Sequence, residues 1–143
     1  MIYIRFVNEV KLALIKHAQI NPTRECGGFL YGKIVREKNN IICDIDAIYY
    51  ENKLGSDCEF NFNLSYIENA KKVLKQLKSE CLMGTYHSHG LYDATFSDVD
   101  RNKLQKFFGE NKITMIYSPT YSQLVGEFLD ENGISHKARI VTK

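Results

Sequence analysis

Residues 81–100, CLMGTYHSHGLYDATFSDVD, pass from an apolar run through a polar stretch to a sequence typical of a helix start. The run at 81–89 predicts a buried strand. Ser97 and Asp100 form the S-x-x-D pattern of a helix N-terminus, so a helix is expected over residues 97–110. Two histidines and three aspartates fall within residues 84–100. Such a concentration of potential ligands between a strand and a helix indicates a functional site.

The remaining sequence predicts an α/β fold of the α+β type, with one domain over residues 1–143. We expect one curved mixed sheet flanked by about three helices. The other expected strands are 2–6, 26–35, 40–50, 112–117, 123–129 and 134–141. The other expected helices cover 8–21 and the segment from Leu64, where Ser65 and Glu68 resemble a capping box. Residues 51–63 are polar and irregular and predict a loop.

Composition excludes several classes of protein. The hydrophobic content of 44% and charged content of 25% are ordinary for a soluble domain. A net charge of +2 gives no case for a nucleic-acid partner or an anionic membrane. No apolar run approaches the ~20 residues of a membrane span, and residues 1–10 lack the features of a signal peptide. We therefore expect a cytoplasmic protein whose four cysteines, none in a C-x-x-C pair, are free thiols.

The histidines form half of a candidate zinc site. Side chains two apart on a strand share a face, so His87 and His89 project together and Ser88 projects the other way. Asp100 is the natural third ligand, leaving a fourth position open for water. Catalysis by a zinc-bound water also needs a proton shuttle, a carboxylate that is not itself a metal ligand. Glu25 fits, because the glycines after it allow close approach of a neighbouring strand.

Each of these residues has a simpler interpretation when taken alone. The H-x-H pair can be two ordinary histidines. Ser97 and Asp100 can serve only as a helix cap, and Glu25 can be a surface residue. The combined spacing favours the metal site. The two remaining histidines, His17 and His136, are interpreted as surface residues.

The arrangement of Glu25, the HSH at 87–89, Ser97 and Asp100 resembles the signature of the JAMM (JAB/MPN-type) zinc metalloproteases, a glutamate followed by H-[ST]-H-x7-S-x2-D. ECGGFLYG, from Glu25, resembles the glycine-bearing strand of the compact prokaryotic branch. The resemblance covers nearly the whole chain and implies the family's cytidine-deaminase-like JAB/MPN fold. It also implies one zinc ion per chain, bound by His87, His89 and Asp100. Glu25 is then the general base, and Ser97 hydrogen-bonds the oxyanion.

The implied reaction is hydrolysis of the amide bond after the C-terminal tail of ubiquitin or a ubiquitin-like protein. The substrate is a conjugate or a precursor, and some relatives trim sulfur-carrier proteins. Bacterial relatives accompany ubiquitin-like conjugation machinery, including antiphage operons, which implies such components as partners. Two alternatives stay open: a catalytically silent MPN scaffold, and the DNA-repair-associated branch, which commonly has asparagine at the position of Ser88.

Three departures from the family pattern concern the surroundings of the site. Gly90 and Phe96 replace prolines that are common in relatives, which predicts a more mobile loop at 90–96. No long insertion follows Asp100, as expected for the compact branch. The loop at 51–63 corresponds to the region that cradles the substrate tail in relatives, where an extended tail can add as a strand. On this hypothesis, exchange of Phe60 and Phe62 for alanine impairs cleavage.

Overall fold

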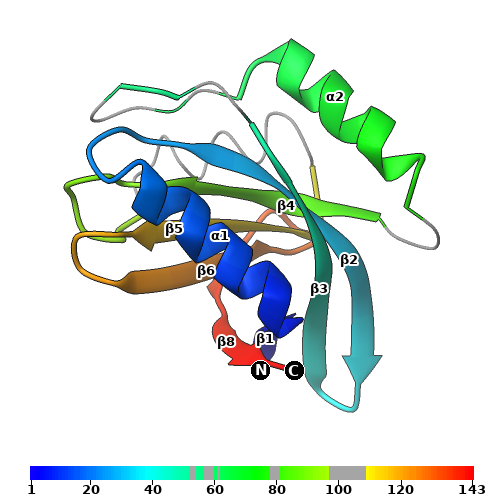
Figure 1. Ribbon diagram of the computed structural model, residues 1–143. Coiled ribbons are helices and arrows are strands. Elements are labelled where there is room, and N and C mark those ends of the chain that lie inside the picture. The colour runs from blue at the N-terminus through cyan, green and yellow to red at the C-terminus, as the bar shows by residue number, and fades with distance from the viewer. Residues whose placement is uncertain (52–53, 57–59, 61, 78–80, 97–108) are drawn as a thin grey trace.

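The computed structural model describes residues 1–51, 54–56, 60, 62–77, 81–96 and 109–143. Its strands form one mixed sheet in the order β7-β6-β5-β4-β2-β3-β1-β8 (Figure 1). Their bounds are β1 Ile2–Phe6, β2 Gly27–Glu37, β3 Asn40–Tyr50, β4 Cys81–Ser88, β5 Lys112–Ser118, β6 Gln123–Leu129, β7 Ser135–Lys137 and β8 Arg139–Thr142. The pairs β4–β5, β1–β3 and β1–β8 are parallel, and the other pairs are antiparallel. The expected mixed sheet of an α+β fold is confirmed.

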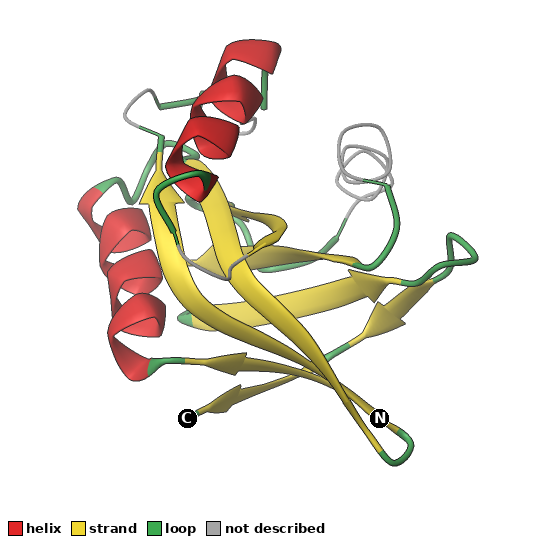
Figure 2. Ribbon diagram, turned by 90° about the vertical axis from the view of Figure 1, so that its right-hand side faces the viewer, coloured by secondary structure: helices red, strands yellow, loops and turns green. Residues whose placement is uncertain are grey.

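The sheet is strongly curved, as the long β2–β3 hairpin shows (Figure 2). Residues 134–141 were expected to form one strand, but the structure has β7 on one edge of the sheet and β8 on the other. Ala138 alone separates these two strands, and its N–H donates to the Gly126 carbonyl at 3.0 Å. A single residue can join opposite edges only because the sheet curls until they approach each other.

Two helices lie in the described part of the chain, α1 (Asn8–Ile20) and α2 (Leu64–Leu74). This is fewer than the expected three, and the helix expected at 97–110 falls almost wholly outside the described residues. The start of α2 also differs from the expected capping box. Asn63 is the N-cap, and its side-chain oxygen accepts from the Tyr66 N–H at 3.0 Å. Asparagine is among the best N-cap residues, and its position one residue before the helix suits this bond.

The helices contribute to two separate hydrophobic clusters. Val10, Leu14 and Ala18 of α1 belong to the larger cluster, with buried side chains of β1 to β6. Ile67 and Ala70 of α2 belong to the smaller cluster, with side chains of β2 and β4. The residues that alternate along the first half of β2 therefore fall into different clusters, as a sheet buried on both faces requires.

Phe60 and Phe62 belong to this second cluster rather than to an exposed loop. They are 2% and 5% exposed, their ring centroids are 4.9 Å apart, and Phe62 also packs edge-on against Phe29. Exchange of these two rings for alanine would therefore remove core packing, so a loss of cleavage in such variants would not report on a docked substrate tail. Aromatic side chains in a polar segment become buried where they can pack against the apolar face of a neighbouring helix.

Among the described residues, no helix is long and apolar enough to cross a membrane. Cys26 and Cys43 are buried free thiols, and Cys81 is an exposed one, in agreement with the sequence. Cys58 lies outside the described residues.

Candidate metal centre

Strand β2 begins two residues after Glu25 and pairs antiparallel with β4, which contains His87 and ends one residue before His89. Gly27 at the start of β2 pairs with His87 near the end of β4. A Cβ atom on Gly27 would lie 2.9 Å from the Tyr86 carbonyl oxygen and 2.7 Å from the Phe60 ring. The expected close approach at these glycines is therefore confirmed, because a side chain at Gly27 would push the two strands apart.

The imidazoles of His87 and His89 converge on one point. Their Nε2 atoms are 3.2 Å apart, with ring centroids 5.0 Å apart. Two nitrogens bound to one tetrahedral zinc at 2.0–2.1 Å would be separated by about 3.3 Å. His87 is 4% exposed and His89 is half-buried, so both rings are held within the fold. The observed separation fits two ligands of a single metal ion.

The tautomer of His89 also suits a metal ligand. Its Nδ1 lies 2.7 Å from the carbonyl oxygen of Asp93. A carbonyl only accepts hydrogen bonds, so Nδ1 carries the proton, and the lone pair of a neutral ring lies on Nε2. The main chain is fixed as well, because the His89 N–H donates to the Tyr117 carbonyl at 3.0 Å. Such outer contacts orient metal-binding histidines.

Glu25 is buried and is not a surface residue. It is 5% exposed and lies two residues before Gly27, so strand alternation directs it to the face of His87. Its main chain is held by residues from the segment expected to be a loop. The Glu25 N–H donates to the Ser56 carbonyl at 2.8 Å, and the Gly55 N–H donates to the Glu25 carbonyl at 2.7 Å. Part of that segment therefore holds the main chain of Glu25 in place.

Ser97 and Asp100 lie outside the described residues, so neither their expected roles at the metal nor their capping role is decided. In the described part of the chain, no group of three histidine, cysteine, aspartate or glutamate side chains is arranged to hold a metal ion. The two histidines supply two donors, and Asp100 remains a prediction for the third.

The loop after His89 has a backbone path that proline cannot adopt. Gly90 has φ +55°, whereas proline is restricted to about −65°. The Thr120 hydroxyl donates to the Gly90 carbonyl at 3.0 Å, and the Ser118 hydroxyl donates to the Tyr92 carbonyl at 2.5 Å. The loop is thus tied to the β5–β6 turn at two main-chain carbonyls. Gly90 has a conformational role here, beyond the mobility that the sequence predicts.

Glu51 is a buried carboxylate that sequence reasoning missed. It is 5% exposed, and its N–H donates to the Gly27 carbonyl at 3.0 Å, on the side of Gly27 opposite His87. Burial raises the pKa of Glu51, and within the described residues its Oε1 has no hydrogen-bond partner. Its place in a polar segment gave no signal, because burial there depends on how the segment folds back.

The interpretation of His17 as a surface residue was wrong. Its Nδ1 lies 2.6 Å from the Tyr86 hydroxyl, and its ring packs against Tyr50 with centroids 4.6 Å apart. Burial lowers the pKa of His17 and raises that of Tyr86 well above its usual value. The signal was present in the sequence, because His17 shares a helical face with Val10 and Leu14.

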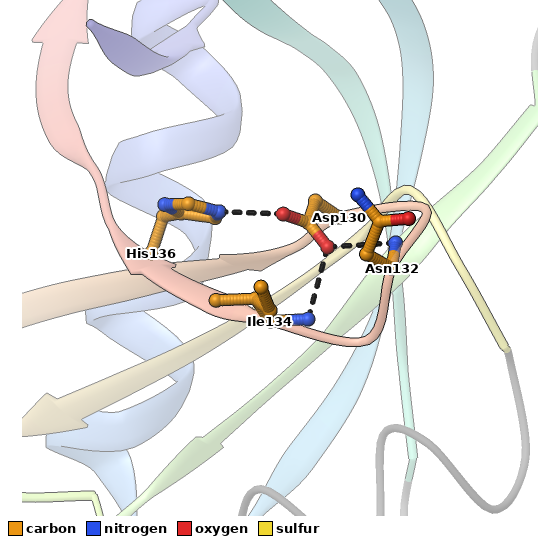
Figure 3. A network of polar contacts seen from close by, with 4 residues as sticks. All are labelled: Asp130, Asn132, Ile134 and His136. Carbon is orange, nitrogen blue, oxygen red and sulfur yellow. Dashed lines mark hydrogen bonds and ion pairs between the residues drawn. The ribbon is translucent and has the colours of Figure 1, made fainter.

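His136 takes part in a hairpin turn rather than in the candidate site. Its Nε2 lies 2.7 Å from Asp130 Oδ2, while Asp130 Oδ1 accepts from the N–H groups of Asn132 and Ile134 at 2.8 and 2.9 Å (Figure 3). These bonds, the one from His136 foremost, hold the pKa of Asp130 below its usual range. The network closes the turn between β6 and β7.

A curved mixed sheet with a pair of converging histidines at the end of β4, and a buried glutamate two residues before β2, defines an α+β domain with a candidate metal centre at its middle strands. The sequence profile of a family described as prokaryotic homologs of the JAB domain matches residues 7–129, and the chain belongs to this family. The expected membership of the compact prokaryotic branch is confirmed. No curated protein sequence matches this chain.

Among solved structures, the chain is similar to the protein DSY2949 from Desulfitobacterium hafniense, determined in solution. The two share 20% sequence identity with a TM-score of 0.75, over 98% of this chain and 92% of that one. At this identity the likeness supports the fold alone.

Proposed function

We propose that this protein is a zinc-dependent isopeptidase or peptidase that cleaves the amide bond after the C-terminal tail of a ubiquitin-like protein. The observation that carries the proposal is the 3.2 Å separation of the His87 and His89 Nε2 atoms. It matches two ligands of one tetrahedral zinc ion. The lone pair that the Asp93 contact leaves on His89 Nε2 adds support.

His87, His89 and Asp100 would hold one zinc ion per chain. When bound, that ion would act as a Lewis acid and would lower the pKa of water at the site toward ~7. Glu25 takes a proton from the attacking water and delivers it to the leaving amine. Ser97 donates a hydrogen bond to the oxygen on which negative charge develops. The burial of Glu25 suits this role, because a base shielded from bulk water keeps the proton it has accepted within the site.

The substrate is a ubiquitin-like protein, either joined to another protein or in precursor form. Processing of a sulfur-carrier protein is the alternative reaction. Components of a bacterial ubiquitin-like conjugation or antiphage operon are the proposed partners. Deconjugation and processing share their chemistry, so the substrate surface decides between them.

The first experiment measures zinc per chain in the purified protein and in His89→Ala, Asp100→Ala and His136→Ala. One zinc is expected in the wild type and in the His136→Ala control, and little in the other two variants. An unaltered zinc content in His89→Ala would contradict the site. A wild type without zinc after reconstitution would favour the scaffold function.

The second experiment tests the base on ubiquitin-like fusion substrates. Glu25→Gln is expected to keep its zinc while turnover falls by at least ~100-fold, the scale of a lost general base. Turnover close to that of the wild type would exclude this role for Glu25.

A further inference from the structure

Ser88, the residue between the two histidines, makes an unusual contact with the strand that carries Glu25. Its N–H donates to the Cys26 carbonyl at 2.8 Å, as in a regular antiparallel ladder. The Cys26 N–H, however, donates to the Ser88 side-chain Oγ at 2.9 Å. Both residues are fully buried. A side-chain oxygen therefore takes the place that the ladder gives to the Ser88 carbonyl.

The bond between Cys26 and Ser88 lies one residue from Glu25 on one chain and one residue from His89 on the other. Continuing the register from Gly27 and His87 places Cys26 opposite Ser88, and Glu25 opposite His89. Residues in such a non-hydrogen-bonded pair come as close as about 4.5 Å between Cα atoms. The bond to Oγ fixes Cys26, the residue next to Glu25, against the residue between the two histidines. The two chains stay close beyond this point, because a Cβ atom on Gly90 would lie 3.5 Å from the Thr23 carbonyl carbon and 3.7 Å from the Arg24 nitrogen.

Each of the two chains is also bonded to an outer neighbour. Glu25 bonds through its main chain to Gly55 and Ser56, and the His89 N–H bonds to Tyr117 of β5. The Ser88 hydroxyl adds a side-chain contact between these two chains, next to Glu25 on one and His89 on the other.

We propose that Ser88 is a positioning residue whose hydroxyl sets the distance between Glu25 and the histidine ligands. The inference rests on the proposed function, since it assigns Ser88 a role in the placement of that base. The ring of His89 is oriented by another contact, that of its Nδ1 with the Asp93 carbonyl, and its main chain is held by Tyr117. Loss of the hydroxyl should therefore disturb the base and leave metal binding intact.

The test compares Ser88→Ala with Ser88→Thr, which retains a hydroxyl. Ser88→Ala is expected to bind one zinc with an affinity within about 3-fold of the wild type. The kcat for cleavage of ubiquitin-like fusion substrates is expected to fall about 10- to 100-fold, the scale of a base displaced by about 1 Å. KM is expected to stay within about 3-fold, and Ser88→Thr is expected to restore kcat. Thr114→Val, which removes a buried hydroxyl from β5, is the matched control and should retain wild-type kcat.

A double variant separates this role from a general loss of structure. If Ser88 acts through Glu25, adding Ser88→Ala to Glu25→Gln should lower kcat no further. Should Ser88→Ala prove unstable, Ser88→Cys keeps the side-chain volume with a weaker acceptor, and the same loss is expected.

Wild-type kcat in Ser88→Ala, loss of zinc in that variant, or a further fall in the double variant would each overturn the inference. A wild type that binds no zinc and cleaves no fusion would instead show failure of the proposed function, and the positioning role would fall with it.

Discussion

Replacing Gly27 with alanine tests whether close approach of β2 and β4 is what the site requires. The added Cβ would lie 2.7 Å from the Phe60 ring and 2.9 Å from the Tyr86 carbonyl oxygen. Ordinary carbon contacts lie at ~3.5–4.0 Å, so these contacts are short by about 0.6 Å or more. The carbonyl belongs to a paired strand and cannot move alone.

Gly126 offers a matched control, because a Cβ there would be equally crowded by different atoms. It would lie 2.6 Å from Ile4 Cδ1 and 2.8 Å from Met115 Sδ. Both atoms are near the ends of flexible side chains that can change rotamer. Overpacking costs about 1–3 kcal/mol, and alanine regains about 0.4–1 kcal/mol by restricting the unfolded chain. We expect Gly27→Ala to lose about 2 kcal/mol of unfolding free energy and Gly126→Ala to stay within about 0.5 kcal/mol of the wild type.

Urea denaturation followed by far-ultraviolet circular dichroism measures both values, since the chain has no tryptophan. In thermal melts the same loss corresponds to a fall in Tm of about 4–8 °C for Gly27→Ala. Zinc uptake should weaken in Gly27→Ala alone, because Gly27 pairs with His87. Equal destabilisation of the two variants, or a Gly27→Ala protein as stable as the wild type, would refute the argument from the Tyr86 carbonyl.

Two further predictions concern the loop and the helix. Gly90→Pro introduces the residue that is common in the family at this position. It should lower turnover about 10-fold or more, because proline cannot adopt φ +55° and the contact with Thr120 would be lost. Improved turnover of fusion substrates would contradict this. Burial lowers the pKa of His17, so the unfolded state binds more protons below its ordinary pKa of ~6.5. Unfolding free energy should therefore decline as pH falls from about 7 toward 5, and His17→Gln should flatten this decline in urea titrations. An identical slope in the variant would assign the pH dependence to other groups.

Much of the candidate site could be predicted because its sequence signals depend on residues that are near one another along the chain. The alternation of a strand is enough to put His87 and His89 on one face, and the two glycines after Glu25 mark a close approach of strands. Asp100 and Ser97 follow from spacing within the same segment, and they remain predictions. The contacts that refine the site are not local. The bond from Cys26 to Ser88 joins residues 62 positions apart, and that between His17 and Tyr86 joins residues 69 apart.

The sequence by itself determined most of the strands, the two helices and the family, because periodic burial and a short ligand motif depend on neighbours along the chain. Only the tertiary structure decided that residues 134–141 divide between opposite edges of the sheet, since this depends on its accumulated curvature. It also decided that Phe60 and Phe62 belong to the core and that Gly90 adopts a left-handed conformation. Each of these outcomes depends on which distant surfaces meet, and a pattern read along the chain carries no information about those encounters.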